Sequence, residues 1–142
     1  MKVLWLVNIP LPEACQLMGE KPTPFGGWLI SASKYLAAQD NISLSIAFPK
    51  LKNKNVIGFR GEKIDYFAFP HIDINDAKLI NHNSYLKTVL KKVQPDIVHI
   101  FGTEFAHSLA MVNTCNELGI KTVISIQGLV SVIEKHYLAN LP

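Results

Sequence analysis

The sequence predicts a single three-layer α/β domain, in which a mainly parallel sheet lies between two layers of helices. Short, continuous apolar runs recur along the chain and are typical of strands that are covered on both faces. Segments with apolar residues at helical spacing separate these runs. Strand and helix alternate in order, which favours parallel strands joined by right-handed crossovers. The 142 residues suit one such domain, spanning residues 1–142.

The expected elements alternate with one interruption. We expect strands at residues 2–7, 42–48, 96–101 and 121–127. We expect helices at residues 26–38, 84–93, 104–118 and 129–138. Two β-like runs, residues 55–60 and 63–69, flank Gly61 and Glu62 and predict an inserted β-hairpin. Residues 9–25 contain four prolines, so we expect a long irregular loop there and no element.

The charge and the composition limit the kinds of partner that we expect for this chain. The formal net charge is only +3, and the clustered Lys50, Lys52 and Lys54 read better as solvated surface than as a nucleic-acid site. Charged residues make up 18% of the chain, below the quarter or so usual for soluble domains. Two interpretations stay open, a generally apolar surface and a face that meets another domain.

The cysteines and the hydropathy pattern indicate a cytoplasmic protein. Cys15 and Cys115 are far apart and have no metal-type spacing, so we expect free thiols in a reducing compartment. The apolar start of the chain is too short for a signal segment. No stretch approaches the roughly eighteen apolar residues that a membrane span requires.

The predicted order of elements places a ligand site. In sheets of this class the chain runs outward from the first strand and then returns to its other side, and a crevice opens where the direction reverses. The loops at that point would be residues 8–27 and 102–104, with residues 127–128 one strand further on. An irregular loop as long as the first is more often functional than idle.

Gly26 and Gly27 stand at the start of a predicted helix after the first strand. Glycine lets a ligand approach backbone N–H groups, and the helix dipole favours phosphate there. The alternative is a tight loop-to-helix entry that needs glycine for its own geometry. The full dinucleotide fingerprint and the P-loop lysine are both missing, which disfavours a nicotinamide enzyme or a P-loop NTPase.

A second group of candidates follows the third expected strand. Gly102, Thr103 and Glu104 lie at that strand's end, where Glu104 could accept hydrogen bonds from sugar hydroxyls. Alternatively, Thr103 is the helix N-cap and Glu104 complements the helix dipole. His107, one turn into the helix, could point back towards the crevice.

The remaining candidates are His99, Gln127 and Gly128. His99 lies within a buried strand, as either a core histidine or a ligand contact. Gln127 and Gly128 end the last strand, where an amide beside a glycine suits hydroxyl recognition. No Ser-His-Asp arrangement, paired carboxylates or metal cluster can be identified, so the catalytic residues stay unknown and no metal is expected.

Four segments together resemble the amino-terminal half of a family 4 glycosyltransferase, a retaining enzyme with the two-domain GT-B architecture. The segments are residues 2–7 (KVLWLV), 24–29 (PFGGWL), 95–102 (PDIVHIFG) and 119–128 (GIKTVISIQG). Their order and spacing carry the resemblance. It implies a Rossmann-like domain that mainly binds the acceptor and faces a carboxyl-terminal domain that holds a UDP- or GDP-sugar.

The resemblance also implies roles for particular residues. Gly26 and Gly27 match the glycine-rich loop that approaches the donor's phosphate or sugar, and His99 matches a frequent strand histidine. Many members have histidines where this chain has Phe101 and Gln127, which shifts the expected acceptor contacts to Glu104 and Gln127. The nucleotide-sugar would be a co-substrate, with no tightly bound cofactor and no metal.

By this resemblance the chain is half of an enzyme and is inactive alone, because the donor-binding domain is absent from it. Catalysis in the family is usually drawn as front-face attack, which relies on positioning and electrostatics. The acceptor would be a sugar, a polysaccharide of the cell envelope or a lipid-linked molecule, compatible with peripheral contact at the inner face of the membrane. Alternatives are another GT-B enzyme, such as a nucleotide-sugar epimerase, and a stand-alone, non-catalytic small-molecule binding domain.

Overall fold

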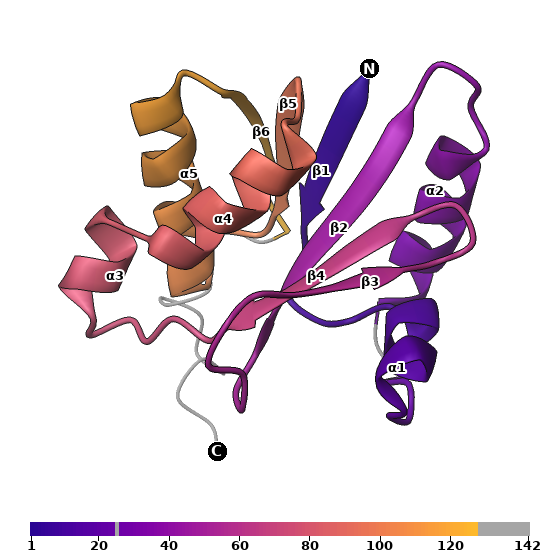
Figure 1. The fold of residues 1–142 in the computed structure, drawn as a ribbon, viewed down its shortest axis with the longest axis horizontal. Helices are drawn as coiled ribbons and strands as arrows, with labels where there is room; N and C mark the ends of the chain where they lie inside the picture. The colour runs from indigo at the N-terminus through magenta and orange to yellow at the C-terminus, as the bar shows by residue number, and fades with distance from the viewer. Residues whose placement is uncertain (25, 128–142) are drawn as a thin grey trace, which may run out of the picture.

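A six-stranded sheet forms the centre of the computed structural model, which describes residues 1–24 and 26–127 (Figure 1). Its strands are β1 (Lys2–Leu6), β2 (Ser43–Lys50), β3 (Ile57–Arg60), β4 (Asp65–Pro70), β5 (Ile97–Phe101) and β6 (Lys121–Ser125). The five helices of the described residues are α1 (Pro12–Met18), α2 (Gly27–Ala37), α3 (Ala77–Asn81), α4 (Ser84–Val93) and α5 (Ala106–Leu118). The predicted three-layer, Rossmann-like α/β class is confirmed.

The strand order is β3-β4-β2-β1-β5-β6, and every neighbouring pair is parallel except β3 with β4. The chain therefore moves outward from β1 through β2 and β4, and then crosses back to β5 on the other side of β1. The direction reverses between β1 and β5, as the sequence predicts. The antiparallel β3–β4 pair confirms the inserted hairpin around Gly61.

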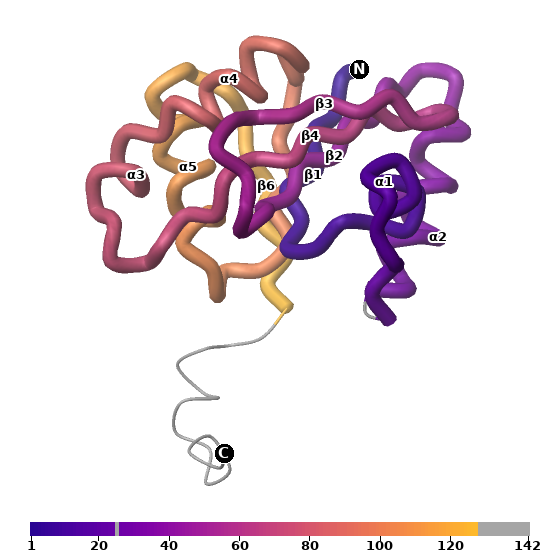
Figure 2. The backbone as a smooth tube through the Cα atoms, turned by 60° about the horizontal axis from the view of Figure 1, so that its bottom comes forward, coloured from indigo at the N-terminus to yellow at the C-terminus, as the bar shows by residue number. Residues whose placement is uncertain are grey.

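The alternation of side chains along β1 divides the core between the two faces of the sheet. Leu4 and Leu6 pack with buried residues of α4 and α5, whereas Val3 and Trp5 pack with α1 and α2. Figures 1 and 2 both show α3, α4 and α5 on one side of the sheet and α1 and α2 on the other. This arrangement follows from right-handed crossovers that run in opposite directions from β1.

Residues 9–25 are not the uninterrupted loop that the prolines suggest, because they contain α1. Pro12 occupies the start of this helix, where its missing N–H costs no hydrogen bond. Gly19 ends it in the left-handed conformation (φ 71°) and donates to the carbonyl oxygens of Cys15 and Gln16. The prolines therefore flank a short helix and do not break one.

Other differences concern short elements and their ends. The five-residue helix α3, which Asp76 caps by accepting a hydrogen bond from the Leu79 N–H, is too short to show helical periodicity. Helix α5 begins at Ala106, later than predicted, and β6 ends at Ser125. Gly119 ends α5 in the left-handed conformation, as predicted. The helix expected at residues 129–138 lies outside the described residues.

Within the described ranges, Cys15 and Cys115 are buried free thiols, as the sequence predicts. In the same part of the chain, no helix combines the length and the apolar character needed to cross a bilayer.

Candidate functional site

Two contacts bring the loop after β1 against the end of β5, where the chain reverses. The Asn8 amide nitrogen donates to the Phe101 carbonyl oxygen at 3.2 Å. The ring of Trp28, the second residue of α2, lies 5.5 Å from the ring of Phe101, measured between centroids. The stretch around the twin glycines and the stretch after Phe101 therefore lie side by side. This juxtaposition is the one that the predicted site requires.

The twin glycines have different structural demands. Gly26 is the N-cap of α2 and has φ 77°, and a Cβ there would lie 3.1 Å from the Ile9 side chain. Its own backbone geometry therefore requires glycine. Gly27 has ordinary φ, and among the described residues no atom beyond its own chain neighbours and helix backbone lies within 4 Å of the place where its Cβ would stand. The fold does not explain glycine at position 27.

The amino end of α2 carries no side-chain cap. The first N–H groups of a helix have no partner within the helix, and together with the dipole they favour an anion. Gly27 leaves the approach to these groups sterically open. This end of α2 can chemically receive a phosphate or another oxygen-rich group.

His107 is 2% exposed and fixes the position of Asn8. Its Nε2 lies 2.7 Å from Asn8 Oδ1. Because the Asn8 amide nitrogen donates to Phe101, Oδ1 must accept, so Nε2 carries the proton. Burial lowers the pKa of His107 to about 4, with a further contribution from nearby His71, which keeps its imidazole neutral near pH 7. His107 is a positioning residue that links α5 to the end of β1.

His99 is half-buried on the α2 side of the sheet. It is therefore neither fully enclosed in the core nor freely exposed. Its Nε2 lies 2.7 Å from the Ser125 hydroxyl, and its ring stacks on Phe101 at 4.0 Å between centroids. Burial lowers the pKa of His99, which favours the neutral ring. A neutral imidazole beside a hydroxyl offers both donor and acceptor positions to a polar ligand.

Ser125 was missed by sequence reasoning. A single serine in an apolar strand is uninformative until the register is known. In this sheet Ser125 aligns with Phe101 across the β5–β6 pair, which brings its hydroxyl beside His99.

The segment after β5 folds back over the end of the strand. Gly102 has φ 90°, and a Cβ there would collide with the Glu104 carboxylate and lie 3.4 Å from the Asn8 amide nitrogen. Glu104 is otherwise exposed, so its carboxylate can reach a ligand at the reversal point. The interpretation of Thr103 as an N-cap is wrong, because Phe105 holds that position and no side chain caps α5. Thr103 is exposed.

Of the last two candidate residues, Gln127 and Gly128, the structure describes only Gln127. Gln127 is exposed two residues beyond the end of β6. Gly128 lies outside the described residues. No described contact joins Gln127 to the group around Asn8 and Phe101.

A cavity of about 600 Å³, here called the basic cavity, lies at the carboxyl ends of β1, β2 and β4. Its walls include Asn8 after β1, Lys50 at the end of β2, His71 after β4 and His107 on α5. Of the described candidate site residues predicted from sequence, only His107 lines it. That His107 points back towards the crevice at the chain reversal stays a prediction; its ring lines this cavity. The twin glycines do not line it.

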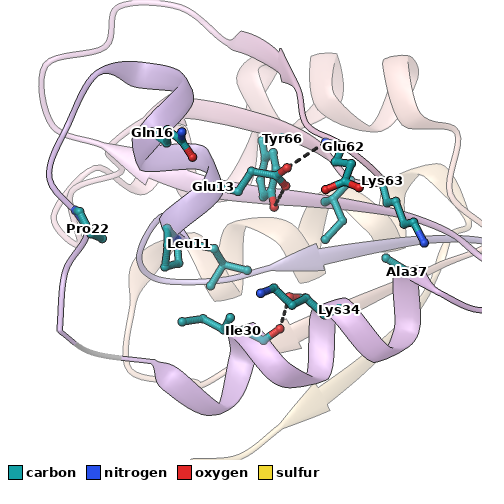
Figure 3. Close-up of a pocket in the computed structure, with 13 residues that line it drawn as sticks. Leu11, Glu13, Gln16, Pro22, Ile30, Lys34, Ala37, Glu62, Lys63 and Tyr66 are labelled. Carbon is teal, nitrogen blue, oxygen red and sulfur yellow. Dashed lines mark hydrogen bonds between the residues drawn. The ribbon is translucent and has the colours of Figure 1, made fainter.

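A second cavity, of about 750 Å³, lies between α1, α2 and the turn of the β3–β4 hairpin (Figure 3). Glu13 of α1 accepts hydrogen bonds from the Tyr66 hydroxyl at 2.7 Å and from the Glu62 N–H at 2.8 Å. These bonds fasten α1 to the hairpin. Sequence reasoning could not find this cavity, because it did not predict α1.

Within the described residues, no group of His, Cys, Asp or Glu side chains has a metal-binding arrangement. The fold defines the class: a doubly wound α/β domain whose strand order reverses between β1 and β5, with polar side chains at the carboxyl edge of its parallel sheet.

Neither a family model nor a curated protein matches the chain. A solved structure described as trehalose-6-phosphate from E. coli bound with UDP-2-fluoro glucose is similar, with 11% sequence identity and a TM-score of 0.47. The similarity covers 98% of this chain and 36% of that one. This chain thus spans about a third of the length of that protein.

Proposed function

We propose that this chain is the acceptor-side domain of a retaining, two-domain GT-B glycosyltransferase resembling family 4, which moves a sugar from a UDP- or GDP-sugar to a hydroxyl acceptor. The observation that carries the proposal is the position of Gly26, Gly27 and Trp28 against Phe101 at the chain reversal. This is where the sequence resemblance requires the glycine-rich loop to be.

The chemistry of the described residues supports this proposal. The uncapped start of α2 suits a phosphate, and Gly27 lets a ligand come close to its N–H groups. Glu104, and His99 with Ser125, offer polar groups for sugar hydroxyls. These residues would bind and orient the substrates, and transfer would depend on positioning and electrostatics. No catalytic base is assigned.

The proposal requires a donor-binding domain outside residues 1–142. Three large apolar side chains are exposed: Trp28 at the start of α2 (53%), Phe105 after β5 (45%) and Ile126 after β6 (62%). Exposed apolar groups around a polar site are typical of a surface that another domain covers. They favour the second interpretation of the low charge content, a face that meets a partner domain. We place the reaction on the cytoplasmic side.

The experiment is a substrate survey of the full-length gene product. The protein is incubated with UDP- and GDP-sugars and with sugar, polysaccharide and lipid-linked acceptors. Mass spectrometry detects transfer, and NMR determines the anomeric configuration. We expect transfer with retention. Conversion of a nucleotide-sugar without an acceptor would indicate an epimerase instead, and binding without any turnover would indicate a non-catalytic domain; both results would overturn the proposal.

A further inference from the structure

We propose that the basic cavity binds the phosphoryl group of a small ligand. In the proposed enzyme this ligand would be the acceptor of the sugar transfer. That role rests on the proposed function, whereas the binding of a phosphoryl group does not. The cavity is separate from the twin glycines, so its ligand would be distinct from the donor phosphate.

Three lysines reach the cavity from different segments. Lys21 follows α1, Lys50 ends β2, and Lys52 lies in the turn after β2. One carboxylate, Glu20, also lines the cavity and pairs with Lys50, whose ammonium lies 2.7 and 2.8 Å from its two oxygens. The lysines therefore outnumber the carboxylate by two. Because His107 is neutral near pH 7, it does not supply this charge.

A neutral donor in the wall also lacks a partner. The Asn53 amide nitrogen is buried, and no acceptor among the described residues bonds it. An unsatisfied buried donor is unfavourable, so such groups are normally satisfied by protein, water or ligand. Because this nitrogen has almost no accessible surface, a phosphate oxygen in the cavity would accept from it once the Asn53 side chain turns towards the ligand.

The volume of the cavity suits a small ligand. A volume of about 600 Å³ is within the usual range for small-molecule sites. Ammonium groups from several directions suit an anion with several oxygens, because each acts as a point charge. The half-exposed ring of Phe105, stacked on His107 at 5.2 Å, offers apolar surface to the carbon skeleton of such a ligand.

The cavity's position in the fold agrees with its chemistry. It lies at the carboxyl ends of β1, β2 and β4. In open parallel sheets, ligands bind outside this edge. The sequence alone indicates solvated surface for Lys50 and Lys52, because it does not show that they line one cavity together with Lys21.

The test is calorimetric titration of the full-length gene product at constant ionic strength. The probes are inorganic phosphate, a hexose monophosphate and the unphosphorylated hexose. We expect saturable binding of the two phosphorylated probes. Hydrogen bonds to charged groups are worth roughly 1.5–3 kcal/mol, so Lys52→Met should weaken binding about tenfold or more. Glu20→Gln should tighten it, because this change removes the only carboxylate among the described lining residues and frees Lys50.

The matched control is Lys92→Met, which removes the same charge from an exposed position on α4. We expect wild-type affinity. Equal affinities in Lys52→Met, Asn53→Ala and Lys92→Met would overturn the proposal, as would failure of the folded wild-type protein to bind either phosphorylated probe. Asn53→Ala tests the neutral donor independently of charge.

A further arm separates two sources of the phosphoryl group. Vesicles of phosphatidylcholine with and without phosphatidylglycerol are added to the same protein. A soluble ligand predicts binding of the hexose monophosphate with no Lys52-dependent attachment to the anionic vesicles. A lipid headgroup predicts such attachment. Lack of both would contradict the inference.

The outcome can be separated from that of the proposed function, since binding is measured without any nucleotide-sugar. Phosphate binding without transferase activity would leave the cavity assigned and remove only its role as the acceptor site. Transfer activity that survives intact in Lys52→Met, together with absent phosphate binding, would overturn this inference alone.

Discussion

Asn8 and His107, 99 residues apart in the chain, are joined by a hydrogen bond of 2.7 Å between Asn8 Oδ1 and His107 Nε2. Asn8 also donates to the Phe101 carbonyl oxygen. One amide thus connects the end of β1 to both the end of β5 and the start of α5. It holds together the segments that form the reversal point.

Asn8→Ala should destabilise the domain. The change leaves the buried His107 N–H and the Phe101 carbonyl oxygen without this partner, which should cost about 1–3 kcal/mol in the free energy of unfolding. Urea denaturation measures the effect. Asn116→Ala, at an exposed position near the end of α5, is the control and should change stability by less than about 0.5 kcal/mol. Equal losses in both variants would contradict the linking role of Asn8.

The free energy of unfolding should fall as the pH drops from 6.5 towards 4. His107 has a pKa of about 4 in the folded protein, below the ordinary value of 6.5. The unfolded chain therefore binds more protons in this window, so the stability present above pH 6.5 is progressively lost, by an amount on the order of 2–3 kcal/mol. Denaturation at several pH values measures the slope. His107→Gln should reduce it, and an unchanged slope would show that His107 titrates normally.

Gly26→Ala and Gly27→Ala should have opposite effects on stability. At Gly26 a methyl group meets a left-handed backbone and the Ile9 side chain, which should cost about 1–2 kcal/mol. At Gly27 the space is open and φ is ordinary, so alanine should be neutral or stabilise by up to about 1 kcal/mol. Thermal unfolding measures both. Similar destabilisation by the two changes would mean that the described geometry of Gly27 is wrong.

Tyr66 should resist ionisation in the folded protein. Burial raises the pKa of Tyr66, because the ionised phenol would be removed from water. The hydrogen bond to Glu13 raises it further, because the ionised phenol would face a carboxylate. The unfolded tyrosine ionises near pH 10, so the folded state should lose stability above that value. Ultraviolet titration of wild type and Glu13→Gln measures this effect. The variant should ionise at lower pH; a titration identical to wild type would exclude the contribution of Glu13.

The sheet could be predicted from the sequence because its strands are covered on both faces. The runs that became β1 and β5 are short, apolar and bounded by turn residues, so they report burial directly. Helix α1 could not be predicted, because its evidence is local capping: Pro12 at the start and Gly19 at the end of only seven residues. Proline signals a loop and a helix start alike.

The sequence could predict which segments meet at the candidate site, but not the contacts that single side chains make there. The order of elements indicates which loops meet, and the Trp28–Phe101 contact agrees with it. The partners of single side chains depend on register and loop path. Ser125 could therefore not be recognised as the partner of His99. The Asn8–His107 hydrogen bond joins residues that are far apart in the chain and leaves no pattern in the sequence.

The most direct measurement is kcat/KM for sugar transfer by the full-length gene product carrying Gly27→Ala or Gly27→Val. Apart from its chain neighbours and helix backbone, no atom of the described residues lies within 4 Å of a Cβ at this position, so both variants should fold normally. If the α2 amino end approaches the donor, added side-chain bulk should displace it, and displacement of about 1 Å can lower the rate roughly a hundredfold. We predict a graded loss, larger for valine. Wild-type kcat/KM in folded Gly27→Val would contradict the donor role of the twin glycines.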